Sequence, residues 1–178
     1  MERGIFLITG IMASGKSTVA ELLSRQFDKS VHLRGDVYRK MIVQGREEML
    51  PEASQEAVRQ LELRYRLAAS AADAYYDAGF TVVVQDVVIG PMLQQFVDYV
   101  GRAPLYVVVL APDEETVALR EAGRSKKGYG PWSVAGLNEI LHMETPRLGL
   151  WLDTSKLTPE ETVQEILRLA ETEALVKA

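Results

Sequence analysis

Residues 10–17 match the pattern G-x-x-x-x-G-K-[ST] at every defined position, and this spacing is typical of a loop that holds phosphate groups. Glycines permit backbone angles that a β-carbon forbids, so successive N–H groups can turn inward around an anion. Lys16 would place its charge on the β- and γ-phosphates, which makes it a predicted catalytic residue, and the Ser17 hydroxyl would bind Mg²⁺. The residues expected at the nucleotide are Gly10, Ala13, Ser14, Gly15, Lys16, Ser17 and Thr18. The alternative is a strand-to-helix turn that binds nothing.

Asp36 follows a short apolar run, at the end of a predicted strand, where ligands of an α/β sheet bind. A carboxylate there can take the proton of an attacking hydroxyl, so Asp36 is a candidate catalytic base and acceptor-binding residue. Arg39 lies about one helical turn later and would share a face with Asp36, where it could hold a substrate or reduce charge repulsion at the phosphate. The alternative role for Asp36 is to N-cap the next helix.

Two further strand ends carry polar side chains. Asp86 ends the run Val82–Asp86, and an apolar strand that ends in aspartate is the Walker-B pattern, in which the acid holds Mg²⁺ directly or through water. Asp86 is therefore a predicted metal ligand together with Ser17, with substrate binding and a simple turn as the alternatives. Asp153–Ser155 follows the fifth predicted strand, where Thr154 is a candidate contact of the nucleotide base and a turn is the alternative.

Residues 119–131 form a basic segment with four cations, three glycines and one acid. Loops that close over phosphates need mobile hinges and cationic tips that meet developing charge. Arg120 and Arg124 are spaced i, i+4 and would face the same way if a helix continues through both. They are predicted catalytic residues of a lid, and Arg120 is also a predicted nucleotide contact. The alternative is a solvated charged loop.

Five apolar runs predict the strands that position these residues, and the valines at 82–84 and 107–109 are typical of strands buried on both faces. The predicted strands are Gly4–Thr9, Val31–Arg34, Phe80–Asp86, Leu105–Leu110 and Leu148–Leu152. Pro51–Ala78 predicts one long helix that Gly79 ends, and Thr158–Glu161 has the capping residues of a last helix. Alternating strands and helices imply an α/β sandwich with right-handed crossovers.

The composition limits the class of protein. The 178 residues include 25 acidic and 20 basic side chains, a net charge of −5, no cysteine and two histidines. These values exclude a disordered chain, disulfides, thiol catalysis and cysteine–metal sites, and they disfavour a generic DNA-coating protein. We expect one domain over residues 1–178, no membrane span and a cytoplasmic location.

Other residues have structural interpretations. His32 and His142 are predicted to be structural or surface residues, and Trp132 and Tyr129 to pack in the core or the lid. Four arginines are predicted to form solvated pairs on helices, one of them between Glu62 and Arg66: Arg46, Arg59, Arg64 and Arg66.

Together, the phosphate-binding loop, Asp36–Arg39, the strand ending at Asp86 and the two lid arginines resemble the small P-loop kinases. The chain is most similar to chloramphenicol phosphotransferase-like proteins and to the kinase domain of polynucleotide kinase. The resemblance implies a P-loop NTPase three-layer sandwich, with a five-stranded parallel sheet in the order 2-3-1-4-5 and a short lid. It also implies that Asp36 takes the proton of the acceptor hydroxyl, that Arg39 helps to bind substrate or phosphate, and that Arg120 and Arg124 belong to the lid.

The expected function is therefore an ATP-dependent kinase that transfers the γ-phosphate to a hydroxyl of a small molecule, such as an antibiotic or metabolite, with Mg²⁺ as cofactor. One alternative is a nucleotide-binding NTPase or regulator without an acceptor. The other is a 5′-hydroxyl nucleic-acid kinase, which the acidic composition and the glycine before Asp36 disfavour. The expected partners are a nucleoside triphosphate and an alcohol acceptor, and neither the acceptor nor the oligomeric state follows from the sequence.

Overall fold

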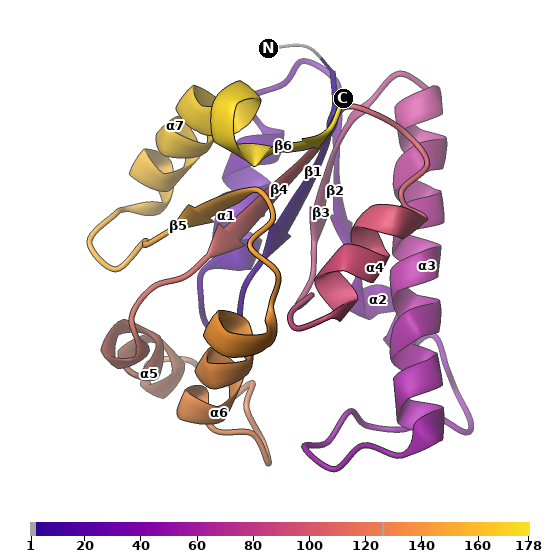
Figure 1. The fold of residues 1–178 in the computed structure, drawn as a ribbon, viewed down its shortest axis with the longest axis vertical. Coiled ribbons are helices and arrows are strands. Elements are labelled where there is room, and N and C mark those ends of the chain that lie inside the picture. The colour runs from indigo at the N-terminus through magenta and orange to yellow at the C-terminus, as the bar shows by residue number, and fades with distance from the viewer. Residues whose placement is uncertain (1–2, 126) are drawn as a thin grey trace.

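The computed structural model describes residues 3–125 and 127–178, and its centre is a β-sheet between two layers of helices (Figure 1). Five parallel strands lie in the order β2-β3-β1-β4-β5, which confirms the predicted order. A short strand that the apolar runs did not predict, β6, pairs with β4 in the antiparallel sense. The strands are β1 (Ile5–Thr9), β2 (Ser30–Arg34), β3 (Thr81–Gln85), β4 (Leu105–Leu110), β5 (Leu150–Leu152) and β6 (Leu175–Lys177).

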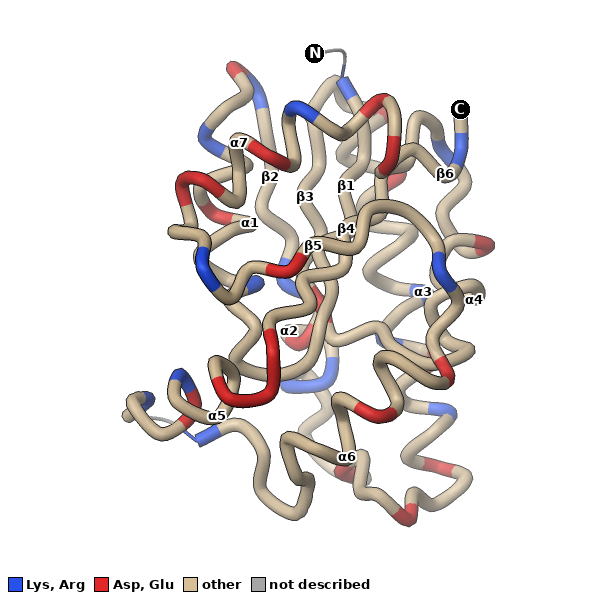
Figure 2. Tube along the Cα trace, turned by 60° about the vertical axis from the view of Figure 1, so that its left-hand side comes forward, with Lys and Arg blue, Asp and Glu red and all other residues tan. Residues whose placement is uncertain are grey.

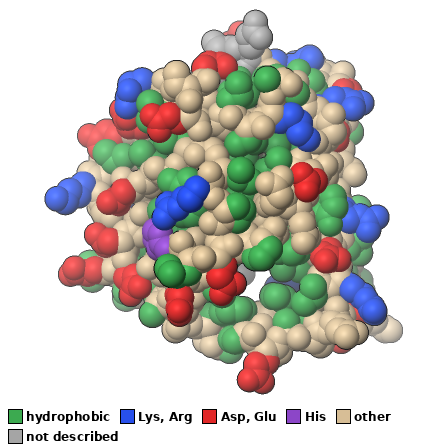
Figure 3. All heavy atoms as spheres, in the orientation of Figure 1, with side chains coloured by type: hydrophobic (Ala, Val, Ile, Leu, Met, Phe, Trp, Pro, Cys, Tyr) green, Lys and Arg blue, Asp and Glu red, His purple; other side chains and the backbone are tan. Residues whose placement is uncertain are grey.

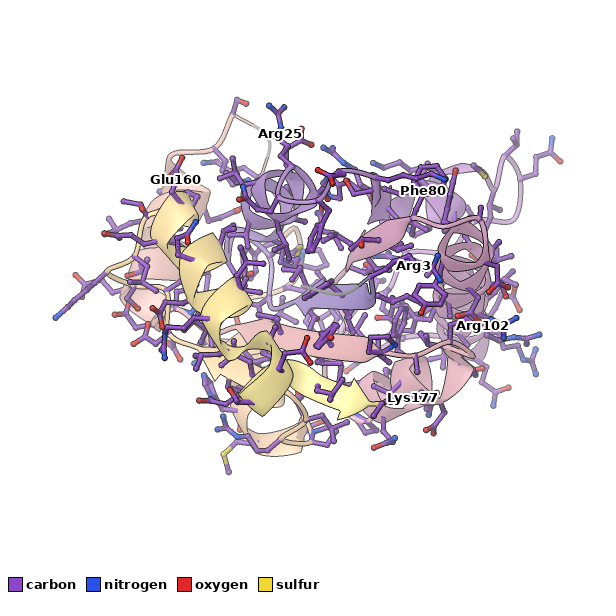
Figure 4. All side chains as sticks on the ribbon, turned by 90° about the horizontal axis from the view of Figure 1, so that it is seen from above. Arg3, Arg25, Phe80, Arg102, Glu160 and Lys177 are labelled. Carbon is purple, nitrogen blue, oxygen red and sulfur yellow. The ribbon has the colours of Figure 1, made fainter. Side chains whose placement is uncertain are left out.

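The helices cover both faces of the sheet. Seen from above in Figure 4, α7 and α1 lie on one side of the strands and α3 and α4 on the other. The helices are α1 (Lys16–Ser24), α2 (Asp36–Lys40), α3 (Gln55–Asp77), α4 (Met92–Tyr99), α5 (Glu114–Ala122), α6 (Val134–Glu139) and α7 (Pro159–Leu169), with π-helical turns at Ile140–Glu144 and Ala170–Ala174. Within the described part of the chain, no helix has the length and apolarity to cross a membrane.

The central strands are buried on both faces, as their continuous apolar runs predict. Along β1, Ile5 and Leu7 pack into the core under α3 and α4, whereas Phe6 and Ile8 pack into the core under α1 and α7. Successive side chains of a strand point to opposite faces, so one apolar run fills two cores. The same alternation continues in β3 and β4.

Local signals explain where the long elements begin and end. Helix α3 begins after Ser54, whose hydroxyl accepts from the N–H of Ala57, and Gly79 follows its end with a φ of 91°. Helix α7 begins with the capping box that the sequence predicts between Thr158 and Glu161. Lys177 of β6, labelled in Figure 4, donates to the carbonyls at the end of α4.

The parallel register brings the carboxyl ends of the strands to one edge of the sheet. Ile8 lies opposite both Gln85 and Val108, and Arg34 lies opposite Gln85. The segments that follow β1, β2 and β3 therefore meet there, at the opposite end of the molecule from both termini (Figure 1). Figure 2 shows basic residues beside α2 and α5 near this edge, with acidic residues close to them.

Candidate active site

The loop between β1 and α1 has the backbone of an anion cradle. Gly10, Ala13 and Gly15 have positive φ angles of 145°, 63° and 99°. A β-carbon at Gly10 would meet the Leu110 carbonyl and the Ser14 hydroxyl, so only glycine fits there. Among the described residues, Ala13 is the one non-glycine with a positive φ, a conformation that clusters at functional sites. The N-terminus of α1 follows directly and favours a bound anion.

Lys16 is folded into this loop. Its side chain is 7% exposed, and its Nζ donates to the Ile11 carbonyl at 2.6 Å. Burial lowers the pKa of Lys16 to about 7; the charge of Asp86 opposes this shift, while those of Arg124 and Arg64 add to it. An incoming phosphate would supply the counter-charge that the buried ammonium needs.

Gln85 is the side chain that reaches Ser17 from the end of β3. Its Nε2 donates to the Ser17 Oγ at 2.8 Å. Its Oε1 lies 2.8 Å from the Nε2 of His32, whose Nδ1 lies 3.3 Å from Glu21. Gln85 could not be predicted from the sequence, because an amide beside an aspartate matches no motif.

The structure does not place Asp86 at Ser17, contrary to the Walker-B interpretation. The carboxylate of Asp86 is 1% exposed and forms a two-pronged ion pair with Arg64, with 2.8 Å between Arg64 Nε and Asp86 Oδ2. It also accepts from the N–H of Val87 at 2.7 Å. The physical reason is strand alternation: Gln85 shares the face of Val83 beside α1, whereas Asp86 turns toward α3. The Asp86 carboxylate lines the cavity, but its oxygens are already bonded to Arg64 and to the N–H of Val87.

The prediction that Arg64 forms a solvated surface pair is wrong. Arg64 is 13% exposed; burial opposes its charge, but the charge and hydrogen bond of Asp86, with the nearby Tyr65 and Asp36, together outweigh burial and raise the pKa of Arg64. The backbone at Gly35 lies against the pair, and a β-carbon there would collide with the Asp86 carboxylate. The glycine before Asp36 therefore makes room for this ion pair. The Glu62–Arg66 pair is also not found among the ion pairs of the described residues, whereas Arg59 pairs with Glu56 on the surface as predicted.

Asp36 is the first residue of α2 and opens onto the cleft. Helix α2 has no side-chain cap, so the structure does not use Asp36 in the alternative role. Its Oδ2 lies 2.6 Å from Lys40 Nζ and the side chain is 46% exposed. Partial burial opposes ionisation, but the hydrogen bond and charge of Lys40 outweigh it and hold the pKa of Asp36 below its ordinary value. Arg39, one turn on, pairs with Glu48 at 2.6 Å.

Arg120 and Thr154 border a second, smaller hollow beside the phosphate loop. Arg120 donates to the carbonyls of Ser14 and Thr154 at 3.3 and 3.2 Å. Thr154 is 3% exposed, and its hydroxyl has no hydrogen-bond partner. The hollow has a volume of about 270 Å³ and is also lined by Leu157 and Pro159. Its place next to the anion cradle and its unpaired hydroxyl fit the base end of a nucleotide whose phosphates occupy the cradle.

The predicted lid is a segment docked on the phosphate loop. Helix α5 ends at Ala122, so Arg120 and Arg124 do not share one helical face as the i, i+4 spacing suggested. Arg124 instead pairs with Glu121 at 3.1 Å. Tyr129 donates its hydroxyl to the Met12 carbonyl at 2.7 Å. Of the predicted lid, Lys126 lies outside the described residues.

The lid also reaches the loop between α2 and α3. The indole N–H of Trp132 donates to the carbonyl of Met49 at 2.9 Å. Trp132 and Tyr129 thus hold the two sides of the lid, in agreement with the packing role predicted for them. Below this bridge lies a cavity of about 1360 Å³ that contains Lys16, Asp36, Arg39, Arg64 and Arg124 in its lining. Figure 3 shows a hollow in the lower part of the face it draws, with hydrophobic side chains at its rim.

The residues present fit a nucleoside triphosphate with Mg²⁺. The cradle supplies positive-φ backbone that can turn N–H groups toward an anion, and a buried ammonium, and the exposed Ser17 hydroxyl oxygen is the hard donor that Mg²⁺ prefers. No group of three acidic or histidine side chains within the described ranges could hold a metal alone. The cation would therefore be bound through Ser17 and the nucleotide phosphates.

Comparisons with known proteins identify the family. The model of the AAA_33 family, an AAA domain, matches residues 5–141, which is most of the chain, and the chain belongs to this family. A search of curated protein sequences found no match. Three similar solved structures are a sugar kinase from Janibacter sp. HTCC2649, the tunicamycin resistance protein of Deinococcus radiodurans, and the Mycobacterium tuberculosis APS kinase in complex with AMPPNP and APS.

These three structures share the fold with this chain at low sequence identity. The sugar kinase is 16% identical with a TM-score of 0.70, and the match covers 94% of each chain. The tunicamycin resistance protein is 16% identical with a TM-score of 0.68, over 99% of this chain and 100% of that one. The APS kinase is 19% identical with a TM-score of 0.66, over 97% and 100%. The chain therefore has the small P-loop kinase fold over nearly all of its length.

Proposed function

We propose that this member of the AAA_33 family is an ATP-dependent kinase that phosphorylates a hydroxyl of a small molecule. The observation that carries the proposal is that a complete anion cradle and an ionised, exposed carboxylate, Asp36, line one cavity. A P-loop protein that only hydrolyses or senses nucleotide has no need for a second compartment beside the cradle. The sugar kinase, tunicamycin resistance and APS kinase structures that share the fold support the same reaction class.

Each residue has a defined part in this reaction. The cradle and Lys16 hold the triphosphate, while Arg120 and Thr154 border its base. Asp36 orients the acceptor hydroxyl and takes its proton as the oxygen–phosphorus bond forms and ADP leaves. Arg124 in the lid lies on the cavity side, where a guanidinium can meet charge on the transferring phosphoryl group. Mg²⁺, when bound at Ser17, would neutralise charge on the phosphate oxygens.

The charges at the acceptor end favour an uncharged acceptor. Four cations line this part of the cavity, and each lies within 4.0 Å of a carboxylate. The pairs are Arg34 with Glu21, Arg39 with Glu48, Lys40 with Asp36 and Arg64 with Asp86. Between them lie apolar and aromatic side chains, among them Tyr38, Met49, Leu61, Ile89 and Trp132. We infer a neutral alcohol with an apolar or aromatic body, and the paired cations disfavour a polyanionic nucleic-acid strand.

The test is transfer of labelled γ-phosphate to a panel of alcohols: neutral aryl and nucleoside-type antibiotics, sugars, acidic sugars and 5′-hydroxyl oligonucleotides. We expect product with a neutral, apolar member. Asp36→Asn should lower transfer by roughly 10²–10⁴-fold, because the base is lost, without changing AMPPNP binding. Asp98→Asn, an exposed change on α4, is the matched control. ATP hydrolysis that no acceptor alters would instead favour the regulator, and full transfer by Asp36→Asn would exclude Asp36 as the base.

A further inference from the structure

The Ser17 hydroxyl is held by a chain of side chains that no P-loop motif specifies. Gln85 on β3 donates to Ser17 on α1, and His32 on β2 lies against the other end of the same amide. Glu21, one turn after Ser17 on α1, lies beside the far nitrogen of His32. The His32 ring is only 10% exposed, whereas the Glu21 side chain and the bond between Gln85 and Ser17 are open to solvent. The chain begins and ends on α1 and fixes the first turn of that helix to the two strands.

The hydrogen bond from Gln85 determines which acceptor positions of the Ser17 oxygen remain for a cation. A serine hydroxyl carries two acceptor positions and one donor, and it rotates freely when no partner holds it. Gln85 occupies one acceptor position from the side of the sheet. The second acceptor position of Ser17 then remains for a cation beside the anion cradle. An amide has no charge, so this contact orients the hydroxyl without adding to the negative charge around the metal.

His32 selects which end of the Gln85 amide faces Ser17. An amide turned end for end would present its oxygen to the hydroxyl instead of its N–H group. A His32 ring with N–H groups on both nitrogens donates to Glu21 and to Gln85 Oε1, and the bond to Oε1 leaves Nε2 of Gln85 toward Ser17. Glu21 holds the ring from the opposite side, with Arg25 and Arg34 near the Glu21 carboxylate. The ring therefore has a fixed place from which to hold the amide.

We propose that Gln85, held by His32, is a positioning residue for the Mg²⁺ that accompanies the nucleotide. It acts through Ser17 and touches neither the metal nor the phosphates. The proposal rests on the nucleotide use proposed above. The Walker-B interpretation gave Asp86 the different task of holding Mg²⁺ directly or through water, whereas the structure bonds the Asp86 carboxylate to Arg64. Partners that orient a metal ligand in this way typically affect metal affinity by about 10- to 100-fold.

The test is calorimetric binding of AMPPNP to the full chain, with and without Mg²⁺, where the ratio of the two affinities is the Mg²⁺ gain. Gln85→Ala should reduce the Mg²⁺ gain about tenfold, because Ser17 loses its orientation. Its metal-free AMPPNP affinity should equal that of the wild type, because Lys16 and the cradle are unchanged. His32→Ala should lose part of the Mg²⁺ gain. Gln85→Glu should keep the gain, because an isosteric carboxylate accepts from the hydroxyl and still fixes it.

Two controls match the altered side chains. Gln94→Ala removes an exposed glutamine on α4, and His142→Ala removes the other histidine of the chain, so both should keep the full Mg²⁺ gain. A full gain in Gln85→Ala would overturn the proposal, and so would equal weakening of metal-free and Mg²⁺-dependent binding, which indicates a structural role. A full Mg²⁺ gain in His32→Ala would show that His32 does not hold Gln85 in this role. A wild type with a normal Mg²⁺ gain that phosphorylates no acceptor would contradict the proposed function and leave the role of Gln85 intact.

Discussion

The two ends of the cavity are built in opposite ways. The nucleotide end is mostly one continuous segment, residues 10–18, whose buried cation, Lys16, has only neutral hydrogen-bond partners. The acceptor end gathers α2, the loop after it, α3, the end of β3 and the lid, and the cations that α2 and α3 contribute to it, Arg39, Lys40 and Arg64, each have a carboxylate partner. The nucleotide end is thus prepared for a highly charged ligand that completes it. The acceptor end is electrostatically complete before any ligand arrives.

The largest expected effect comes from breaking the buried pair at the acceptor end. Arg64→Met leaves the Asp86 carboxylate buried without its partner, which typically costs about 3–5 kcal/mol in the free energy of unfolding. Urea unfolding measures it. Arg59→Met on the same helix removes an arginine that is 71% exposed in its pair with Glu56, so it should change stability by no more than about 1 kcal/mol. Equal effects of the two substitutions would contradict a structural pair at Arg64.

Urea unfolding of Lys16→Met tests whether the nucleotide end, unlike the acceptor end, keeps its stability without its buried charge. The ammonium of Lys16 is buried beside neutral oxygens, so its replacement by an apolar side chain of similar length should not destabilise the protein. A loss as large as that of Arg64→Met would mean that the nucleotide end, too, depends on its own charge for folding. The same variant should nevertheless lose productive use of ATP.

A smaller effect is expected from pH at the nucleotide end. With a pKa of about 7, Lys16 loses its proton above neutral pH in the free protein, whereas bound phosphates would keep it charged. Nucleotide binding at pH 8 should therefore take up a proton and be about tenfold weaker than at pH 6. Calorimetry in two buffers of different ionisation enthalpy measures the uptake. Lys16→Arg retains a permanent charge, so it reports the titration of the nucleotide alone; equal proton uptake by this variant would exclude Lys16.

The nucleotide end could be predicted from sequence because its geometry is local. A motif of eight residues determines the cradle, and the strand before it and helix after it are clear from their apolar periodicity. Ala13 is the exception, since nothing in the pattern marks an alanine for a positive φ. The five parallel strands were likewise accessible from their apolar runs, and their order from the resemblance to small P-loop kinases. Strand β6 was not, because only two apolar residues, Leu175 and Val176, precede Lys177 in it.

The acceptor end could not be predicted in the same way, because its contacts join distant segments. The sequence does contain one signal for Arg64: it lies four and eight residues before Ala68 and Ala72, which are fully buried, and so shares their helical face. The Walker-B interpretation placed Asp86 beside Ser17, whereas the structure places Gln85, the residue before it, there. In a strand, one residue changes the face, and this placed Gln85 beside Ser17 and Asp86 beside Arg64.

The smallest expected effects come from the lid, where two substitutions that each remove one hydrogen bond separate the two ends. Trp132→Phe removes the hydrogen bond to the Met49 carbonyl, and Tyr129→Phe removes the one to the Met12 carbonyl. Each bond is worth about 0.5–1.5 kcal/mol, so each variant should raise one KM by roughly threefold to tenfold. Trp132→Phe should raise the KM of the acceptor found in the transfer panel, because it loosens the roof of the acceptor end. Tyr129→Phe should raise the KM of ATP, because it loosens the lid from the phosphate loop. If both variants changed both constants alike, the lid would act as one rigid cover and the division of the cavity into two separately held ends would be wrong.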